Sequence, residues 1–315
     1  MKWILVGRSS IAQRRVLPAL RSHARASAIS IASSRPPPEA DAKDVVHYAD
    51  YESGIASSGA DIAYISLENS DHARWTERAL MQGMHVVVDK PAFLSYEDAT
   101  RLARLAKARG LCLAEAAVFG SHPQVEALRG VFTEASVRPT RAFAALSFPP
   151  LRADDFRYRR ERGGGALYDL GSYVAATSRL VFGAQPASVT CRITERQADG
   201  LDIGFSVLLT YEGEGALVGH YGFNTEYQNR LLVFGPGAAA ELQRAFTLPP
   251  DTGNQITVRR NNVESVVKIA PADSFGLFLS GVVAAIGRRD WTAYEQALLQ
   301  DAALVRRLID AANET

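Results

Sequence analysis

The chain opens with Lys2-Trp3-Ile4-Leu5-Val6-Gly7-Arg8-Ser9-Ser10-Ile11-Ala12, the segment with the clearest information about its fold. Its first five residues form an apolar run typical of a buried strand, and Gly7 permits a tight turn. Ser9 and Ser10 can cap a helix, which we expect over residues 10–23. A strand, a glycine turn and a capped helix in succession predict the first half of a β-α-β unit.

The first third of the 315-residue chain repeats this alternation. Short apolar strands alternating with longer helices predict an α/β fold, in which a parallel sheet covered on both faces forms a doubly wound Rossmann domain. Ligands bind at the carboxyl ends of such strands, where Gly7, Leu67 and Lys90 would meet. The further strands are expected at residues 28–32, 44–48, 61–67, 85–89 and 111–117, and the further helices at residues 71–82 and 96–109.

After about residue 120 the pattern changes to long two-residue alternations. They predict a second α/β domain with a large, open and mostly antiparallel sheet. We therefore expect a dinucleotide-binding domain at residues 1–120 and a second domain at residues 121–315. The expected strands are residues 187–195, 203–211, 216–223, 230–234, 255–260 and 263–269, and the expected helices are residues 123–132, 166–182, 273–288 and 293–312.

Composition excludes several classes of protein. A net charge of +1 and a pI near 7.8 argue against nucleic acid or an acidic membrane as a partner. Cys112 and Cys191 lie in apolar runs and predict buried thiols in a reducing compartment. The six histidines lack helical i, i+4 pairing, so no metal site is expected. Without a signal-peptide pattern or an apolar run of ~20 residues, the protein is expected to be soluble and cytoplasmic.

Lys90 stands where a buried strand ends, in the tripeptide Asp89-Lys90-Pro91. Arginine is the usual cation of this chain, whose only lysines are Lys2, Lys43, Lys90, Lys107 and Lys268. A lysine ammonium is a compact point charge whose pKa shifts when it is desolvated, which suits proton or hydride chemistry. The alternative interpretation of Lys90 is a solvated turn at a strand end.

The turn after the first strand keeps only the first glycine of the dinucleotide pattern G-x-G-x-x-G. The amides that open the next helix could still receive a pyrophosphate, although an ordinary capped helix explains the same residues. NAD enzymes place an acid roughly 20 residues past this turn, but here no Asp or Glu occurs before Glu39. Ser33-Ser34-Arg35 could instead hold a 2′-phosphate, which favours NADP over NAD, unless the early arginines only form a solvated helix face.

Four segments together resemble the Gfo/Idh/MocA family of oxidoreductases, over nearly the whole chain. Residues 7–20 are similar to the first turn and helix of the family's sugar 3-ketoreductases, which act on nucleotide-linked deoxysugars. Residues 64–72 resemble its nicotinamide-side loop, Asp89-Lys90-Pro91 its Glu-Lys-Pro motif, and residues 163–173 its active-site helix. The resemblance implies a Rossmann domain followed by a substrate-binding α/β domain whose open sheet often forms a dimer interface.

The resemblance further implies hydride transfer between a nicotinamide and a sugar carbonyl or hydroxyl, with a ketoreductase of a nucleotide-linked deoxysugar as the first expectation. Tyr173 would donate a proton to the ketone oxygen, and Lys90 would lower the tyrosine pKa and stabilise the alkoxide. Asp169, four residues before Tyr173 on one helix face, would orient a sugar hydroxyl or Lys90. The alternative for Tyr173 is a packed core residue with a satisfied hydroxyl. The expected cofactor contacts are Gly7, Arg8, Ser9, Ser10, Ile11, Ser33, Ser34, Arg35, Leu67, Asn69, His72, Asp89, Lys90 and Pro91.

The segment before the glycine triplet is strongly basic, with Arg152, Arg157, Arg159, Arg160 and Arg162. It could clamp a substrate diphosphate or could be a solvated loop. The same fold could oxidise a free sugar, an inositol or a dihydrodiol, or could serve as a non-catalytic, cofactor-sensing regulator. A homo-oligomer, a dimer or a tetramer, is expected through the C-terminal sheet.

Overall fold

The computed structural model describes residues 1–36, 44–213 and 215–314. The chain divides into two compact units: residues 1–116 with 275–302 form unit 1, and residues 117–274 with 303–315 form unit 2. The first boundary is close to residue 120, where the sequence pattern changes. Residues 275–302, expected in the second domain, group with unit 1 instead.

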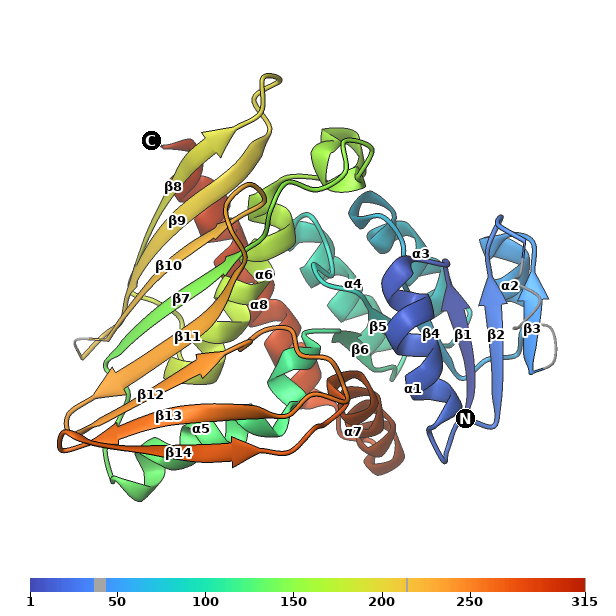
Figure 1. Cartoon of the computed structure of the whole chain (residues 1–315). Helices are drawn as coiled ribbons and strands as arrows, with labels where there is room; N and C mark the ends of the chain where they lie inside the picture. Colours follow the sequence, from blue (N-terminus) through green and yellow to red (C-terminus); the bar gives the residue numbers. More distant parts are fainter. Residues whose placement is uncertain (37–43, 214, 315) are drawn as a thin grey trace. The chain divides into compact units, whose positions relative to one another are not determined.

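Unit 1 is built on a six-stranded parallel sheet with the order β3-β2-β1-β4-β5-β6 (Figure 1). This is the Rossmann order, and it confirms the predicted doubly wound fold. Every residue of β4 is buried, because helices cover both faces of the sheet. The strands are β1 (Lys2–Val6), β2 (Ala28–Ala32), β3 (Val45–Tyr48), β4 (Ile62–Ile65), β5 (His85–Val88) and β6 (Leu113–Glu115).

The helices of unit 1 begin at side-chain caps or bury one apolar stripe. Asp50 caps α2 by accepting from the Ser53 amide at 2.7 Å, and Ser95 caps α4 by accepting from the Asp98 amide at 3.0 Å. The first helix opens with a π-helical turn at Ala12–Val16. The helices are α1 (Leu17–Arg21), α2 (Tyr51–Ser57), α3 (His72–Met81), α4 (Tyr96–Ala108) and α7 (Ser274–Arg288).

Unit 2 is built on an eight-stranded sheet with the order β14-β13-β12-β11-β7-β10-β9-β8 (Figure 1). Within the described strands, β7 and β10 are parallel and the other neighbours are antiparallel, which confirms the predicted mostly antiparallel sheet. The strands are β7 (Arg141–Ser147), β8 (Ser188–Arg196), β9 (Asp202–Thr210), β10 (Ala216–Gly222), β11 (Gln228–Gly235), β12 (Ala238–Gln243), β13 (Asn254–Arg260) and β14 (Val263–Ile269).

The strands β7 and β12 were not predicted from the sequence. Both are rich in alanine, a residue that favours helices and is depleted in strands. In the sheet each is hydrogen-bonded on both sides, β7 by β10 and β11 and β12 by β11 and β13. Tertiary pairing therefore overrides local propensity at these two strands.

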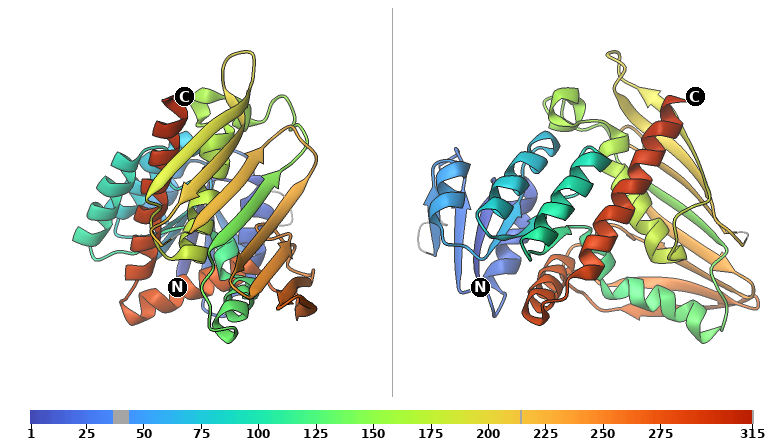
Figure 2. Two further views of the ribbon diagram at one scale, coloured as in Figure 1. Left: turned by 90° about the vertical axis from the view of Figure 1, so that its left-hand side faces the viewer. Right: turned by 180° about the vertical axis from the view of Figure 1, so that it is seen from behind.

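Helices cover one face of the large sheet, as Figure 2 shows for α5 (Pro123–Glu134) and α6 (Ala166–Phe182). The helix α8 (Thr292–Asn313) begins in unit 1, and its part from residue 303 onward packs on the core of unit 2. The two-residue alternation of β9 fits this arrangement. Phe205, Val207 and Leu209 are buried in the core with α6, whereas Leu208 between them is 42% exposed. The outer face of the sheet thus keeps apolar side chains in contact with solvent.

Both cysteines are free and buried, as the sequence predicts. Burial raises the pKa of Cys112 and of Cys191 to about 12, so both thiols stay protonated. Among the described residues, no three His, Cys, Asp or Glu side chains gather as metal ligands would. No helix in the described part of the chain is both long and apolar enough to cross a membrane.

Candidate active site and cofactor site

Gly7 ends β1 at a close approach to the end of β4. Its φ is +103°, and its amide donates to the Ala32 carbonyl of β2 at 3.0 Å. A Cβ at this position would overlap the Ser66 carbonyl and lie 2.6 Å from Cδ2 of Leu67. Glycine is therefore required both by the backbone conformation and by the space.

A chain of hydrogen bonds runs from the first helix across the carboxyl ends of three strands. The Ala12 amide donates to Ser9 Oγ at 3.0 Å, Ser9 Oγ lies 2.7 Å from Ser66 Oγ, and Ser66 Oγ donates to the Asp89 carboxylate. Because Ser66 uses its proton on Asp89, Ser9 must donate to Ser66. Because all donors of this hydrogen-bond chain point the same way, its bonds strengthen one another and hold the turns after β1, β4 and β5 together.

Asp89 is half-buried, and its carboxylate accepts hydrogen bonds within this network. Its Oδ1 accepts a second hydrogen bond from the hydroxyl of Tyr64 at 2.5 Å. Burial raises the pKa of Asp89, and the hydroxyls of Ser66 and Tyr64 and the charge of Lys90 partly offset that rise. The shorter acid of the Asp89-Lys90-Pro91 motif thus anchors the strand end immediately before Lys90, which is also half-buried.

The fully buried imidazole of His72 lies between the loop after β4 and the loop after β5. Its Nδ1 lies 2.9 Å from the Pro91 carbonyl, and its Nε2 lies 3.2 Å from the Leu67 carbonyl. On the other side of the same loop, Glu115 at the end of β6 accepts from the Ala92 amide at 3.0 Å. The peptide bond between Lys90 and Pro91 is cis. The backbone around Lys90 is therefore held by partners from two neighbouring elements.

The end of β2 forms a polar turn beside Gly7. Ser33 is buried and accepts from the Arg35 amide at 3.1 Å, while Ser34 and Arg35 are exposed. Arg8 is 7% exposed and its Nη1 donates to the Pro36 carbonyl at 3.0 Å, so it reaches the same turn. Hydroxyls and guanidinium groups at this place suit a phosphate, and no carboxylate of the described turn opposes one.

The remaining predicted cofactor residues lie at the same edge of the sheet. Ser10 is exposed and Ile11 half-buried where the first helix begins, and Asn69 is buried in the short 3₁₀ turn Asn69–Asp71. The structure thus brings the predicted cofactor residues to the carboxyl ends of β1, β2, β4 and β5. The N-terminus of the first helix lies next to Gly7, which has no side chain to block a ligand, and this arrangement fits the pyrophosphate of a dinucleotide.

In unit 2, the three glycines before α6 each have a reason to be glycine. Gly163 has a φ of +75°, and a Cβ on Gly164 would lie 2.6 Å from the Arg157 carbonyl. Gly165 has a φ of +113° and lets Asp202 of β9 approach, so that Asp202 Oδ2 accepts from the Leu167 amide at 2.6 Å. The triplet therefore fixes where α6 begins and how it is turned.

Asp169, on the first turns of α6, is 3% exposed and pairs with Arg157. Arg157 Nε donates to Asp169 Oδ2 at 3.0 Å, and its Nη1 lies 3.3 Å from Oδ1 of Asp155. Attraction to Asp169 raises the pKa of Arg157 above its ordinary value. The sequence leaves open whether Arg157 belongs to a diphosphate clamp or to a solvated loop, and in the structure it ties the preceding loop to α6.

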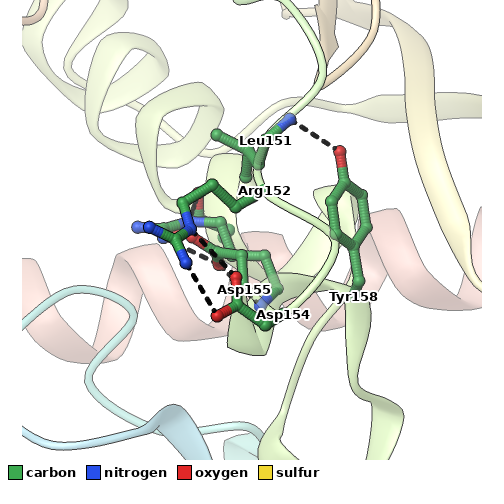
Figure 3. Close-up of polar contacts among 7 residues, drawn as sticks. Leu151, Arg152, Asp154, Asp155 and Tyr158 are labelled. Atoms are coloured by element: carbon green, nitrogen blue, oxygen red, sulfur yellow. Dashed lines mark hydrogen bonds and ion pairs between the residues drawn. The ribbon is translucent and has the colours of Figure 1, made fainter.

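Figure 3 shows the neighbouring part of this loop. Arg152 donates to the carboxylate of Asp154 at 3.1 and 3.2 Å, and the Leu151 amide donates to the Tyr158 hydroxyl at 3.0 Å. The side chain of Arg152 is 87% exposed. Arg159, Arg160 and Arg162 are also exposed, so the interpretation as a solvated loop describes this segment better than a preformed clamp.

Tyr173 lies one turn after Asp169 on α6 and is half-buried. Its ring centroid is 5.7 Å from that of Phe119 and 5.7 Å from that of Phe246, and the two phenylalanine rings meet edge to face at 5.5 Å. Such aromatic packing holds the ring in place. Asp169 and Tyr173 thus both lie on α6 in unit 2, whereas Lys90 belongs to unit 1.

Both parts of the chain match known protein families. Residues 1–117 match the model described as an oxidoreductase family with an NAD-binding Rossmann fold, and residues 136–241 match the GFO/IDH/MocA C-terminal domain. A dTDP-3,4-didehydro-2,6-dideoxy-alpha-D-glucose 3-reductase from Saccharopolyspora spinosa is 31% identical, over 85% of this chain and 82% of that protein. The chain belongs to the Gfo/Idh/MocA family of oxidoreductases.

Further relatives agree with this placement in the Gfo/Idh/MocA family. The enzyme of the same name from Actinomadura kijaniata is 31% identical over 95% of this chain and 93% of its own length. A crystal structure of a 3-ketoreductase from Actinomadura kijaniata in complex with NADP and TDP-benzene has a TM-score of 0.93. It is 26% identical and covers 99% of this chain and 98% of that one. An aldose-aldose oxidoreductase from Caulobacter crescentus, 19% identical with a TM-score of 0.88, shares the fold.

Several residues that build this family site were not predicted from the sequence. Ser66 and Tyr64 were expected only as part of a strand and loop, and their bonds to Asp89 depend on the register of β4 against β5. Arg157 stands out in the sequence as part of a basic run, but the run does not show that its partner is the buried Asp169. Phe246 carried none, because its contact with Tyr173 joins distant parts of the chain.

Proposed function

We propose that this protein is an NADP-dependent 3-ketoreductase of a nucleotide-linked deoxysugar. The observation that carries the proposal is the similarity over 99% of the chain to a 3-ketoreductase whose structure holds NADP and TDP-benzene. Four curated relatives with identities between 27% and 33% carry the name dTDP-3,4-didehydro-2,6-dideoxy-alpha-D-glucose 3-reductase. The groups that such a reaction requires, a cation and a proton donor, are present as Lys90 and Tyr173.

The proposed chemistry divides its work between the two residues. A bound NADPH supplies the hydride, and reduction of the ketone leaves negative charge on its oxygen. Tyr173 donates its phenolic proton to that oxygen, and Lys90 stabilises the developing charge and favours loss of the proton. Asp169, held by Arg157, orients a sugar hydroxyl on the same face of α6. The proposal requires Lys90 and Tyr173 to act on one carbonyl group.

For the cofactor, we propose that Gly7 and the start of the first helix, with Ser9, Ser10 and Ile11, receive the pyrophosphate. The turn with Ser33, Ser34, Arg35 and Arg8 would take the 2′-phosphate. Leu67, Asn69 and the loop from Asp89 to Pro91 would border the nicotinamide, with His72 holding the backbone of both loops. Phosphate chemistry at the end of β2 supports NADP over NAD.

The test is steady-state oxidation of NADPH with a dTDP-linked 3-keto-deoxysugar. Wild-type protein should turn over this substrate, and Lys90→Met and Tyr173→Phe should each lose most of kcat. Full activity in both variants would contradict the proposed chemistry. Separate titrations should give tighter binding of NADPH than of NADH, and the opposite order would contradict the cofactor assignment.

A second candidate function has the same fold and cofactor but a different substrate, a free sugar. A D-xylose 1-dehydrogenase (NADP(+)) from Haloferax volcanii is 25% identical over 100% of this chain and 97% of that protein. Oxidation of a free aldose with NADP, and no turnover of nucleotide sugars, would favour it. Saturable NADPH binding without turnover of any sugar would instead favour a cofactor-sensing regulator.

We also propose a cytoplasmic homo-oligomer that forms through the outer face of the large sheet. Phe143, Val218 and Leu208 lie side by side in register on β7, β10 and β9, and their exposed fractions are 47%, 40% and 42%. Three adjacent exposed apolar side chains are unusual on a face in contact with water. Light scattering should give a dimer or a tetramer, and Val218→Lys should shift it toward monomer. A monomeric wild-type protein would contradict this assembly.

A further inference from the structure

The two edges of the large sheet in unit 2 differ in how they are protected. Among the described strands, β14 forms one edge and β8 the other (Figure 1). An edge strand offers unpaired N–H and C=O groups to any other strand, and bulges and charged side chains usually prevent such pairing. The strand β8 has both, because its register shifts between Ile193 and Arg196 and the side chains of Arg192 and Glu195 are exposed. In contrast, β14 pairs with β13 over all of its seven residues without a shift, so its free edge is regular.

The hairpin between β13 and β14 determines which backbone groups of β14 face outward. Asn261 and Asn262, with φ angles of +48° and +66°, form its two-residue loop, and Arg260 lies opposite Val263. The residues that flank such a loop exchange hydrogen bonds, and along an antiparallel strand every second residue then bonds to the same neighbour. The backbone groups directed away from β13 are therefore those of Glu264, Val266 and Lys268.

The side chains of β14 are unusually exposed for an apolar strand. All of its residues except Ile269 are exposed, and the exposed fractions of Val263, Val266 and Val267 are 69%, 49% and 39%. Since Val266 and Val267 follow each other, they point to opposite faces of the sheet. Apolar side chains are thus exposed on both faces of this strand, as suits a strand that pairs with another one.

The charged residues of β14 are symmetric about Val266. Glu264 precedes it by two residues and Lys268 follows it by two, so the three side chains lie on one face. If two copies pair antiparallel about a two-fold axis at Val266, Glu264 of each copy lies directly opposite Lys268 of the other. Arg259, whose Nη2 lies 3.0 Å from Glu264 Oε2 across the hairpin, continues the alternation of charge. Moving the axis by one residue in either direction leaves no opposite charges face to face, so charge complementarity selects one register.

We propose that β14 pairs with β14 of a second copy of this chain, antiparallel and two-fold about Val266. The outward N–H and C=O groups of Val266 bond to those of Val266 of the partner subunit, and a pair of Glu264 with Lys268 lies on either side of them. The two eight-stranded sheets thereby join into one continuous sheet. This contact uses the edge of the sheet rather than its outer face, and none of the groups assigned to hydride transfer, so it stands or falls independently of the proposed function.

Cysteine cross-linking tests the register. The Cα atoms of a hydrogen-bonded antiparallel pair lie about 5.5 Å apart, which a disulfide can span. The full chain with Val266→Cys should therefore form a covalent dimer when it is oxidised with copper phenanthroline, as measured by denaturing gel electrophoresis. Val263→Cys is the matched control, because this position is more exposed but its two copies would lie about 20 Å apart. The natural cysteines Cys112 and Cys191 are buried. No covalent dimer with Val266→Cys, or equal cross-linking at both positions, would overturn the proposal.

Charge variants test the ion pairs across the axis. They are made in a Val218→Lys background, which removes the contact proposed for the outer face, and sedimentation velocity should show a concentration-dependent dimer of this chain. Glu264→Lys places like charges opposite each other and should weaken that dimer about tenfold. Adding Lys268→Glu exchanges the two charges and should recover most of the affinity. Glu195→Lys, the same change on β8, should leave the dimer unaffected. A monomer before any of these charge changes, or no recovery in the charge-exchanged variant, would overturn the proposal.

Discussion

The carboxyl edge of the sheet in unit 1 and the start of α6 in unit 2 are held by different forces. At the sheet edge, Ser9, Ser66 and Asp89 form a chain of hydrogen bonds and Gly7 allows the turns to approach each other. At α6, one buried ion pair between Arg157 and Asp169 ties a loop to the helix. Backbone geometry thus dominates the first region and charge the second, so each should fail under a different kind of substitution.

The largest expected effect comes from Lys90→Met, which removes a charge without disturbing the bonds that hold its loop. We expect kcat to fall about 10²- to 10³-fold, the usual loss of one group that stabilises transition-state charge. NADPH affinity should change little, because backbone partners keep the loop in place. Lys107→Met, at an exposed position of α4, is the control for loss of a lysine. Equal kcat values for the two variants would contradict the role of Lys90.

Asp169→Asn breaks the ion pair of unit 2. Removing Asp169 leaves the Arg157 guanidinium with Asp155 alone, at 3.3 Å, and a buried charge that loses a partner is costly, so we expect a loss of about 3 kcal/mol in the free energy of unfolding, measured with urea. Asp154→Asn breaks an exposed pair of the same kind and should cost about 0–1 kcal/mol. Restored stability in the double variant with Arg157→Met would identify the charge of Arg157 as the cause, and similar costs for both single variants would argue against burial as the reason.

Gly7→Ala tests the backbone of unit 1. The new Cβ would meet Ser66 and Leu67 at a positive φ, and we expect a loss of about 2 kcal/mol together with weaker NADPH binding. Gly83→Ala shares a positive φ, +89°, but its Cβ meets no atom within 4 Å. The difference between the two variants measures the steric part alone. Unchanged NADPH affinity in Gly7→Ala would show that this turn does not belong to the cofactor site.

Arg35→Ala tests the phosphate site at the end of β2. NADPH affinity should fall about tenfold because a charged hydrogen bond to the 2′-phosphate is lost, whereas NADH affinity should stay the same. Arg14→Ala, on the exposed face of the first helix, should affect neither cofactor. Fluorescence titration with both cofactors gives the comparison. A parallel loss for NADPH and NADH would place the 2′-phosphate elsewhere.

The smallest expected effect concerns pH and His122 of unit 2. Burial lowers the pKa of His122, so the unfolded chain binds more protons at acidic pH. Its contribution to stability is complete above about pH 6.5 and is lost as the pH falls toward the folded-state pKa. His122→Asn keeps a capping acceptor for α5 and should flatten the decline between pH ~7.5 and ~5.5 in urea unfolding. His23 and His85, whose pKa values burial also lowers, remain in the variant as an internal reference. An unchanged slope would contradict the assignment.

The parts of the fold that could be predicted are those in which local and tertiary preferences agree. The helix Ala166–Phe182 has the predicted bounds, because its apolar period matches the face that it buries. The strand Val263–Ile269 also has the predicted bounds and pairs with β13 along its length, although only Ile269 of it is buried. The strands β7 and β12 could not be found, because alanine carries no strand signal without neighbours to pair with. No local feature of the sequence predicts that residues 275–302 pack with unit 1 either, since any apolar helix can pack on several partners.

The sequence by itself determined the Rossmann alternation, the glycine turn at Gly7, the absence of an early acid, and the presence of Lys90, Asp169 and Tyr173 in a family pattern. These are properties of residue type and spacing. The partners of each group follow from the tertiary structure alone: Asp89 accepts from two hydroxyls, His72 lies between the carbonyls of Pro91 and Leu67, and Asp169 pairs with Arg157. The physical reason is that strand register and helix placement bring these partners together, and both depend on the whole core rather than on any short segment.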